Sequence, residues 1–307
     1  MDLYLPIAEM PMNLFLLLGM GAAVGFLSGM FGVGGGFLLT PLLIFSGISP
    51  AVAVASVSSQ IVANSASGVL AYLRKKTVDL KLGLYLTLSG IIGSAIGVWV
   101  YGALRGIGQL DVVIALSYVA FLGTIGMLMA VEAIRAILAK RRGTPLPVRR
   151  PGQHSWIAGL PLRVRFHRSR LYISALPVIA LGASIGFLGA LLGIGGGFIM
   201  VPALIYLLRV PTTIVIGTTL LQTLGTMAFT TFMQSATNQT VDVILGLALM
   251  VGGVVGAQFG ARVGQSLRGE TLRLLLGLLV LSVGLRFAVD LVARPVELYS
   301  ISRMGGG

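Results

Sequence analysis

The chain has 307 residues, of which only 10% are charged, and its mean hydropathy is +0.98. A soluble protein of this length needs a charged surface, so the composition excludes a sizeable soluble domain and predicts a protein that crosses the membrane many times. Cysteine is absent and only two histidines occur, His154 and His167, which excludes thiol chemistry and predicts neither a metal site nor a cofactor.

The formal charge of +13 is concentrated in one stretch, residues 139–171, which contains no acidic residue. Its basic residues are Lys140, Arg141, Arg142, Arg149, Arg150, Arg163, Arg165, Arg168 and Arg170. A basic loop beside membrane spans is typical of a segment that faces the cytoplasmic leaflet. Because no aromatic or recognition motif accompanies these charges, a nucleic-acid partner is not predicted.

Apolar segments follow one another along the whole chain. We predict helical segments at 13–31, 36–46, 51–73, 82–103, 111–138, 172–192, 197–208, 212–235, 242–263 and 271–292. Two of these, 36–46 and 197–208, are too short for a relaxed full span and are expected to be half-helices. The N-terminal residues lack the basic region of a secretory signal, so we expect them to be retained and to form the start of the first helix.

A glycine motif occurs twice. Residues 25–44 read GFLSGMFGVGGGFLLTPLLI, and 161 residues later residues 186–205 read GFLGALLGIGGGFIMVPALI. A second match, Thr-Val-Asp at 77–79 and at 240–242, is 163 residues apart. The sequence therefore predicts a first transmembrane repeat (1–138), a basic linker (139–171), a second transmembrane repeat (172–294) and a tail (295–307).

The basic residues also predict how the repeats are oriented. The loop after 51–73 contains Arg74 and three lysines, whereas its counterpart at 234–241 contains no basic residue. Equivalent loops are therefore expected on opposite sides of the membrane. We predict an all-α integral membrane protein with two inverted-topology repeats of about five helical segments each, glycine-hinged short helices, a cytoplasmic linker and periplasmic termini.

The two glycine runs are the first candidate substrate-binding elements. A helix that begins after a glycine run presents unpaired backbone N–H groups and the positive end of its dipole. Two such ends meeting near the membrane midplane are expected to bind an anion, through Gly34, Gly35, Gly36, Gly195, Gly196 and Gly197. The alternative is that these glycines only permit a turn and close helix packing. No Lys-Ser/Thr follows either run, so neither is a nucleotide-binding loop.

Polar side chains on two later helices are the second set of candidates. We expect Gln60 and Asn64 on 51–73, and Thr219 and Gln222 on 212–235, to line a substrate path, because amides and hydroxyls in lipid must face inward. They could instead coordinate a coupling ion or join neighbouring helices. At the 161-residue spacing Gln222 aligns with Ile61, so a strictly symmetric site is not predicted.

Asp79 and Asp242 precede apolar runs and are interpreted as helix N-caps. No catalytic constellation occurs in the sequence, so an enzyme is not predicted.

The glycine motifs resemble those of the sulfite exporter TauE/SafE family, and the resemblance covers the chain apart from the linker and the tail. It implies a bacterial inner-membrane carrier for sulfite, sulfoacetate or a related sulfur anion, whereas the residues alone reach only a small anion. We therefore predict a secondary transporter, an exporter, that works by alternating access. An anion channel and a non-transporting scaffold whose basic linker binds a partner are the alternatives. The coupling ion, proton or sodium, and a homo-oligomeric state are left open.

Overall fold

The computed structural model describes residues 2–31, 33–141, 162–166, 168–169, 171–208, 210–264 and 269–293. The first half comprises β1 (Asp2–Leu5), β2 (Met10–Asn13), α1 (Leu14–Phe31), α2 (Gly36–Phe45), α3 (Pro50–Arg74), α4 (Leu80–Gly106) and α5 (Leu110–Arg141). The second half comprises β3 (Arg163–Phe166), β4 (Leu171–Ser174), α6 (Ala175–Leu192), α7 (Gly197–Tyr206), α8 (Thr212–Met233), the π-helical turn η1 (Gln234–Asn238), α9 (Val243–Gly264) and α10 (Gly269–Ala293).

The predicted helical segments are confirmed, and α2 and α7 are the short helices that the sequence indicated. Six helices within the described residues are long and apolar enough to cross a membrane. The long helix α3 is not among these six, because serines, Gln60 and Asn64 lower its hydropathy, and these polar side chains are buried. The protein is an all-α membrane protein. Most of the predicted linker, and the whole tail, lie outside the described residues.

Exposed apolar side chains form matching stripes on α4 and α9. The stripe on α4 consists of Leu84, Leu88, Ile92 and Ile96, and the stripe on α9 of Leu247, Val251, Val255 and Phe259. Each stripe follows the four-residue helical spacing, and the two are 163 residues apart. Large apolar side chains that are more than half exposed along a helix are suited to contact with lipid.

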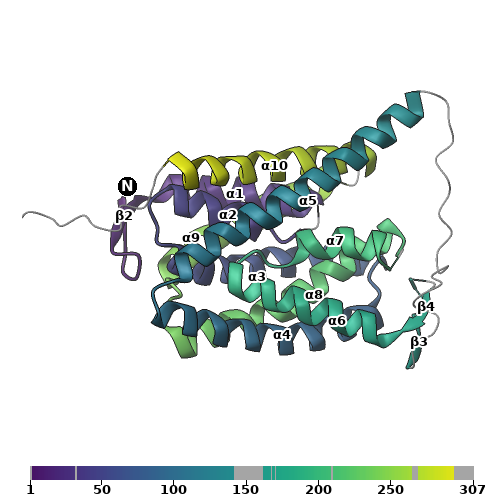
Figure 1. Ribbon diagram of the computed structural model, residues 1–307, viewed down its shortest axis with the longest axis horizontal. Helices are drawn as coiled ribbons and strands as arrows, with labels where there is room; N and C mark the ends of the chain where they lie inside the picture. Colours follow the sequence, from purple (N-terminus) through teal and green to yellow (C-terminus); the bar gives the residue numbers. More distant parts are fainter. Residues whose placement is uncertain are drawn as a thin grey trace, which may run out of the picture.

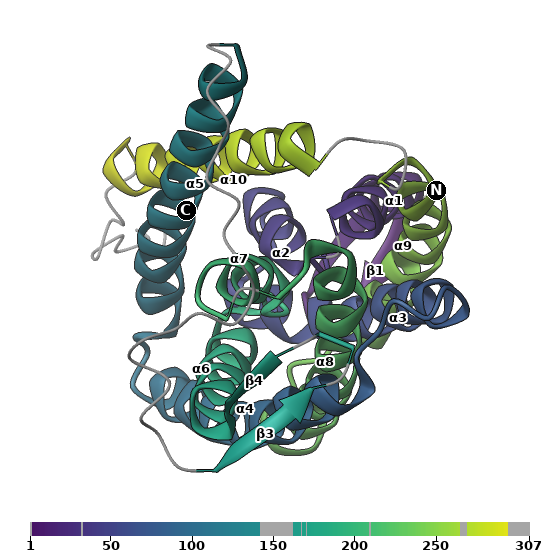
Figure 2. The ribbon, with the colours of Figure 1, turned by 90° about the vertical axis from the view of Figure 1, so that its right-hand side faces the viewer.

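The opposite faces of these helices carry glycines and pack closely on the other half of the chain. A methyl group at Gly93 of α4 would overlap the backbone at Ala183 of α6, and one at Gly256 of α9 would overlap the backbone at Ala22 of α1. The first helix of each half therefore packs against the fourth helix of the other half, while α3 packs on α8 and α5 on α10 (Figures 1 and 2). Close packing of small residues is what holds helices together in lipid.

Each half opens with a short antiparallel hairpin that the sequence analysis missed. β1 pairs with β2 and β3 with β4, and the two hairpins are 161 residues apart in the chain and share the same register. The prediction that the N-terminal residues start the first helix is wrong, because Pro6 and Pro11 cannot donate the hydrogen bonds of a helix interior. The hairpins lie at opposite ends of the long axis of the molecule (Figure 1).

Candidate functional site

Both glycine runs turn the chain through left-handed backbone and then start a short helix. The φ angles are 86° and 84° at Gly34 and Gly35, and 75° and 72° at Gly195 and Gly196. Only glycine adopts this region freely, which is why the motif requires it at these positions. Gly35 and Gly196 are the N-caps of α2 and α7, and neither helix start receives a hydrogen bond from a capping side chain.

The two helix starts meet in the middle of the bundle. A methyl group at Gly36 would overlap the carbonyl of Gly193, and one at Gly197 would overlap the carbonyl of Val33. One residue further along, the rings of Phe37 and Phe198 stack with their centroids 5.4 Å apart. Viewed end-on, α2 and α7 are surrounded by the longer helices (Figure 2). These glycines therefore permit close packing, and both helix starts are buried without a side-chain cap.

The depth of the two loops follows from their contacts with α3 and α8. A methyl group at Gly34 would lie 3.3 Å from both Ile61 Cγ2 and Thr223 Cγ2, and one at Gly195 would lie 3.0 Å from Ile61 Cδ1. Ile61 and Thr223 are near the middle of the 25-residue α3 and the 22-residue α8. The starts of α2 and α7 therefore lie about halfway along the long helices.

The side chains of Gln60 and Asn64 are buried on α3, with exposures of 0% and 1%. Neither the oxygen nor the nitrogen of either amide has a hydrogen-bond partner. They face Gly253 of α9, where an added methyl group would lie 2.5 Å from Asn64 Oδ1 and 2.7 Å from Gln60 Nε2. Unpartnered amides in a protein interior are unfavourable and mark a site that needs an explanation.

The equivalent side chains on α8 are hydrogen-bonded to each other. Gln222 Nε2 donates to Thr226 Oγ1 at 3.1 Å, and Thr223 Oγ1 donates to Gln222 Oε1 at 3.4 Å. These side chains face Gly90 of α4, where an added methyl group would lie 2.6 Å from Thr226 Oγ1. Thr219, the fourth predicted side chain, donates to the carbonyl of Ile216 in its own helix at 2.9 Å.

These contacts correct the alignment of the two halves. Gln222 corresponds to Gln60 rather than to Ile61, because both face equivalent glycines, Gly90 and Gly253, that occupy the same place in the repeat. The spacing is therefore 161 residues at the glycine motifs, 162 at α3 and α8, and 163 from the aspartates onward. One residue is gained on each side of α8, so the polar positions are more symmetric than the sequence suggested.

Ser28 belongs to the same region and was missed. It is fully buried on α1, its hydroxyl has no hydrogen-bond partner, and its Cβ would lie 3.2 Å from a methyl group at Gly35, the N-cap of α2. Its counterpart in the second motif is Gly189. Its hydroxyl, which is absent from the second motif, was the available signal.

Asp79 and Asp242 are buried caps, as predicted, and each also binds a hairpin. Asp79 accepts from the backbone N–H of Leu82 at 3.1 Å, and from the N–H and hydroxyl of Ser169 at 2.9 and 2.7 Å. Asp242 accepts from the N–H groups of Leu245, Ile7 and Ala8 at 3.0, 2.9 and 3.3 Å.

Each aspartate therefore holds the hairpin that opens the other half of the chain. Because the hairpins lie at opposite ends of the molecule, so do the two aspartates (Figure 1). The backbone N–H of Asp79 also donates to Thr218 of α8 at 3.0 Å, and that of Asp242 donates to Ser56 of α3 at 2.9 Å. Helix α8 is thus tied to the Asp79 end of the molecule, and α3 to the Asp242 end.

The family model for the sulfite exporter TauE/SafE matches residues 17–287. The chain belongs to this family. It is 26% identical over 291 residues to the probable membrane transporter protein YunE of Bacillus subtilis (strain 168), covering 89% of this chain and 96% of that protein. It is 29% identical over 277 residues to a probable membrane transporter protein of Xylella fastidiosa (strain 9a5c), covering 89% and 94%.

A second B. subtilis protein, the probable membrane transporter protein YjnA, is 28% identical over 273 residues, covering 87% of this chain and 96% of that protein. No solved structure matches the chain. Family and relatives agree in class, so this TauE/SafE protein is a multi-pass membrane transporter, not an enzyme, and its substrate is a small molecule.

The interior of this TauE/SafE protein carries few charged side chains. Among the side chains that the structure describes, the buried charged ones are Asp79 and Asp242, and no lysine, arginine or histidine is buried. Within the same residues, no group of three side chains is suited to hold a metal ion. Among the described residues, the positive groups at this centre are the backbone dipoles at the starts of α2 and α7.

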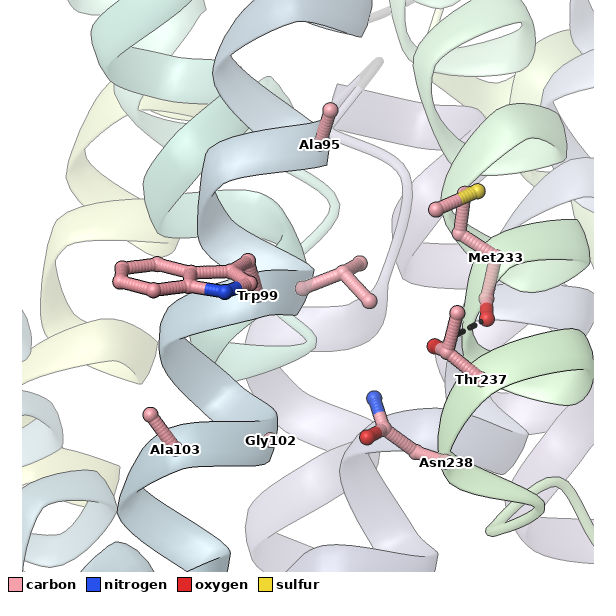
Figure 3. Close-up of a pocket in the computed structure, with 8 residues that line it drawn as sticks. Ala95, Trp99, Gly102, Ala103, Met233, Thr237 and Asn238 are labelled. Atoms are coloured by element: carbon pink, nitrogen blue, oxygen red, sulfur yellow. Dashed lines mark hydrogen bonds between the residues drawn. The ribbon is translucent and has the colours of Figure 1, made fainter.

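A pocket of about 430 Å³ lies away from this centre, between α4 and the end of α8 with η1 (Figure 3). It is lined by Ala95, Val98, Trp99, Gly102, Ala103, Met233, Thr237 and Asn238. Trp99 is 74% exposed on the apolar outer face of α4, so the pocket opens toward the lipid. None of the predicted substrate-binding residues lines it.

Proposed function

We propose that this TauE/SafE protein is a secondary carrier that exports a small anion of the sulfite or organosulfonate class across the bacterial inner membrane by alternating access. The observation that carries the proposal is the meeting of two glycine-capped helix starts halfway along the bundle, with the unpartnered amides of Gln60 and Asn64 on the helix that they contact.

Backbone chemistry supports an anion as the substrate. The first N–H groups of a helix have no partner inside the helix, and the dipole makes this end positive. In α2 and α7 no side chain caps these groups. We therefore assign the backbone of Gly34, Gly35, Gly36, Gly195, Gly196 and Gly197 to substrate binding, with side-chain hydrogen bonds from Gln60 and Asn64. Thr219 and Gln222, the other two predicted side chains, are bonded to protein groups instead.

Alternating access is supported by the arrangement of the halves. The equivalent helices α4 and α9 start at Asp79 and Asp242, at opposite ends of the molecule, as inverted repeats would. At each end one hairpin is held by one buried aspartate. Release of one hairpin while the other stays bound would open the central loops to one side only.

Charge supports the orientation. The β3–β4 hairpin approaches the basic loop after α3, where Lys81 Nζ donates to the carbonyl of Arg165 at 3.2 Å and Arg168 donates to that of Val78 at 2.9 Å. By the positive-inside rule this basic end faces the cytoplasm. The β1–β2 end, with the N-terminus, then faces the periplasm.

The test is counterflow in proteoliposomes that contain the purified protein. Saturable exchange of labelled sulfite against internal sulfite, lost in the Gly35→Val/Gly196→Val double variant, is the expected result, because both positions have positive φ and valine does not adopt it. Leu88→Ala, on the exposed stripe of α4, serves as the control and is expected to keep exchange.

Other outcomes of this experiment would overturn the proposal in different ways. Flux that does not saturate and shows no counterflow would indicate a channel. No flux of any sulfur anion, with folded and inserted protein, would overturn the proposed substrate class. Imposed proton and sodium gradients in the same vesicles identify the coupling ion.

A further inference from the structure

We infer that the central site takes an anion with one negative charge and at least one hydrogen-bond donor, and that it binds a single such anion on the Gln60 side. This inference rests on the proposed function. It is carried by the charge available at the site and by which polar atoms there lack partners.

The two helix starts supply the positive potential of the site. Each helix N-terminus is equivalent to about half a positive charge, so the starts of α2 and α7 together offset about one negative charge. The described side chains add no buried base, and the buried Asp79 and Asp242 add negative potential. A dianion would therefore carry an uncompensated charge into a medium of low dielectric constant, which is strongly unfavourable.

The two amides of α3 offer both hydrogen-bond donors and acceptors to a ligand. The unpartnered atoms of Gln60 and Asn64 are two NH₂ groups, which donate, and two carbonyl oxygens, which accept. A bare oxyanion satisfies the NH₂ groups only. A ligand that also carries an O–H or N–H satisfies a carbonyl oxygen. Since both atoms of each amide lack a partner, the count does not depend on how either amide is oriented.

The second half of the molecule explains why only one anion binds. Gln222 already bonds with Thr226 and Thr223, so its amide is satisfied without a ligand. On the first side the unpartnered hydroxyl of Ser28, beside Gly35, adds a further group that can bond to a ligand near the start of α2. On the second side the hydroxyl of Thr87 on α4, beside Gly225 of α8, also lacks a partner, but both unpartnered amides lie on the α1–α3–α9 side.

Sulfonates of fixed charge test the inference at a single pH, because none of them titrates near neutrality. Three compounds with the same two-carbon chain would compete with labelled sulfite for counterflow by the wild-type protein. They are 2-hydroxyethanesulfonate, a monoanion with a donor; ethanesulfonate, a monoanion without one; and ethane-1,2-disulfonate, a dianion. We expect 2-hydroxyethanesulfonate to compete about tenfold better than ethanesulfonate, the effect of one hydrogen bond of about 1.4 kcal/mol, and the dianion not to compete.

Each other outcome overturns a stated part. Equal competition by the two monoanions would remove the donor requirement, and competition by the disulfonate would remove the charge limit. Competition by the disulfonate only when sodium is present would mean that the amide oxygens hold a cation instead. If sulfite is carried and none of the three competes, the inference fails while the proposed function stands. If sulfite itself is not carried, the proposed function has failed.

A pair of matched variants locates the selectivity. Gly253→Ala places a methyl group against both amides, and Gly90→Ala does the same to the bonded cluster in the second half. We expect Gly253→Ala to abolish the tenfold preference for the hydroxylated sulfonate and Gly90→Ala to preserve that ratio, whatever its effect on the rate. Loss of the preference in Gly90→Ala alone would place the anion on the other side.

Discussion

The polar clusters of α3 and α8 occupy the same place in the two halves of the molecule, yet only one is satisfied. Gln60 and Asn64 face Gly253 and make no hydrogen bond, whereas Gln222 and Thr226 face Gly90 and bond to each other. In the second half the shorter threonine stands where the first half has Asn64. The repeat therefore places the two clusters at equivalent positions, but only the amides of the α3 cluster remain available to a ligand.

The two clusters differ in what they cost the free energy of folding. A buried polar atom without a partner costs about 1–3 kcal/mol, and the α3 cluster contains four such atoms in its two amides. A helix that served packing alone would be more stable with apolar side chains there. The α8 cluster carries no comparable penalty because its amide is bonded.

The largest loss of stability is expected at Gly36 and Gly197, because each packs against the backbone of the other glycine motif. Gly36→Val and Gly197→Val each place a side chain on a backbone carbonyl of the other motif, which cannot move aside. We expect each variant to lose about 3 kcal/mol or more of stability, measured as loss of the folded fraction and of the unfolding temperature in detergent.

Gly19→Val is the matched control, because a side chain at Gly19 of α1 would meet nothing within 4 Å. Wild-type behaviour is expected for it. Tolerance of Gly36→Val together with failure of Gly197→Val would contradict the reciprocal contact of the two loops.

The next effect separates the two clusters. Gln60→Leu removes two unpartnered atoms, so we expect unchanged or higher stability together with loss of anion counterflow. Gln222→Leu leaves Thr226 and Thr223 without a bonded amide and should lower the free energy of unfolding by about 1–2 kcal/mol. Chemical unfolding in detergent, with flux in parallel, measures both. Equal destabilisation by the two substitutions would show that Gln60 has a partner.

A smaller and local loss of stability is expected at Asp79 and Asp242, which lie at the two ends of the molecule. Asp79→Ala and Asp242→Ala each remove a cap worth about 1 kcal/mol and free one hairpin. Hydrogen exchange should rise in β3–β4 for Asp79→Ala and in β1–β2 for Asp242→Ala, since among the described residues each aspartate bonds to that hairpin and not to the other one. A rise in the opposite hairpin would contradict independent closure of the two ends.

The smallest loss of stability is expected from a change at Ser169, which distinguishes the two hairpins. Asp79 receives both the N–H and the hydroxyl of Ser169, whereas the corresponding residue at the other end, Ala8, offers only its N–H. Ser169→Ala makes the ends alike and should cost about 1 kcal/mol. Thermal unfolding in detergent measures the change, and a loss as large as that of Asp79→Ala would mean that the hydroxyl, rather than the cap, holds this end.

Much of the fold could be predicted because local patterns dictate it. Helix positions follow from apolar length, and the caps at Asp79 and Asp242 follow from an acid before an apolar run. The hairpins were missed because each is stabilised by an aspartate more than 80 residues away in the chain. The alignment error at Gln222 arose because single-residue gains leave no local trace.

By itself the sequence determined the class of protein, the helical segments and the glycine runs where α2 and α7 start, because hydropathy and backbone freedom are properties of neighbouring residues. The tertiary structure was needed to show that the two runs touch, that Gln60 and Asn64 lack partners, and that the unpartnered Ser28 lies beside Gly35. Whether a buried amide is satisfied depends on what another helix brings to it, and here α3 meets Gly253, which has no side chain to offer.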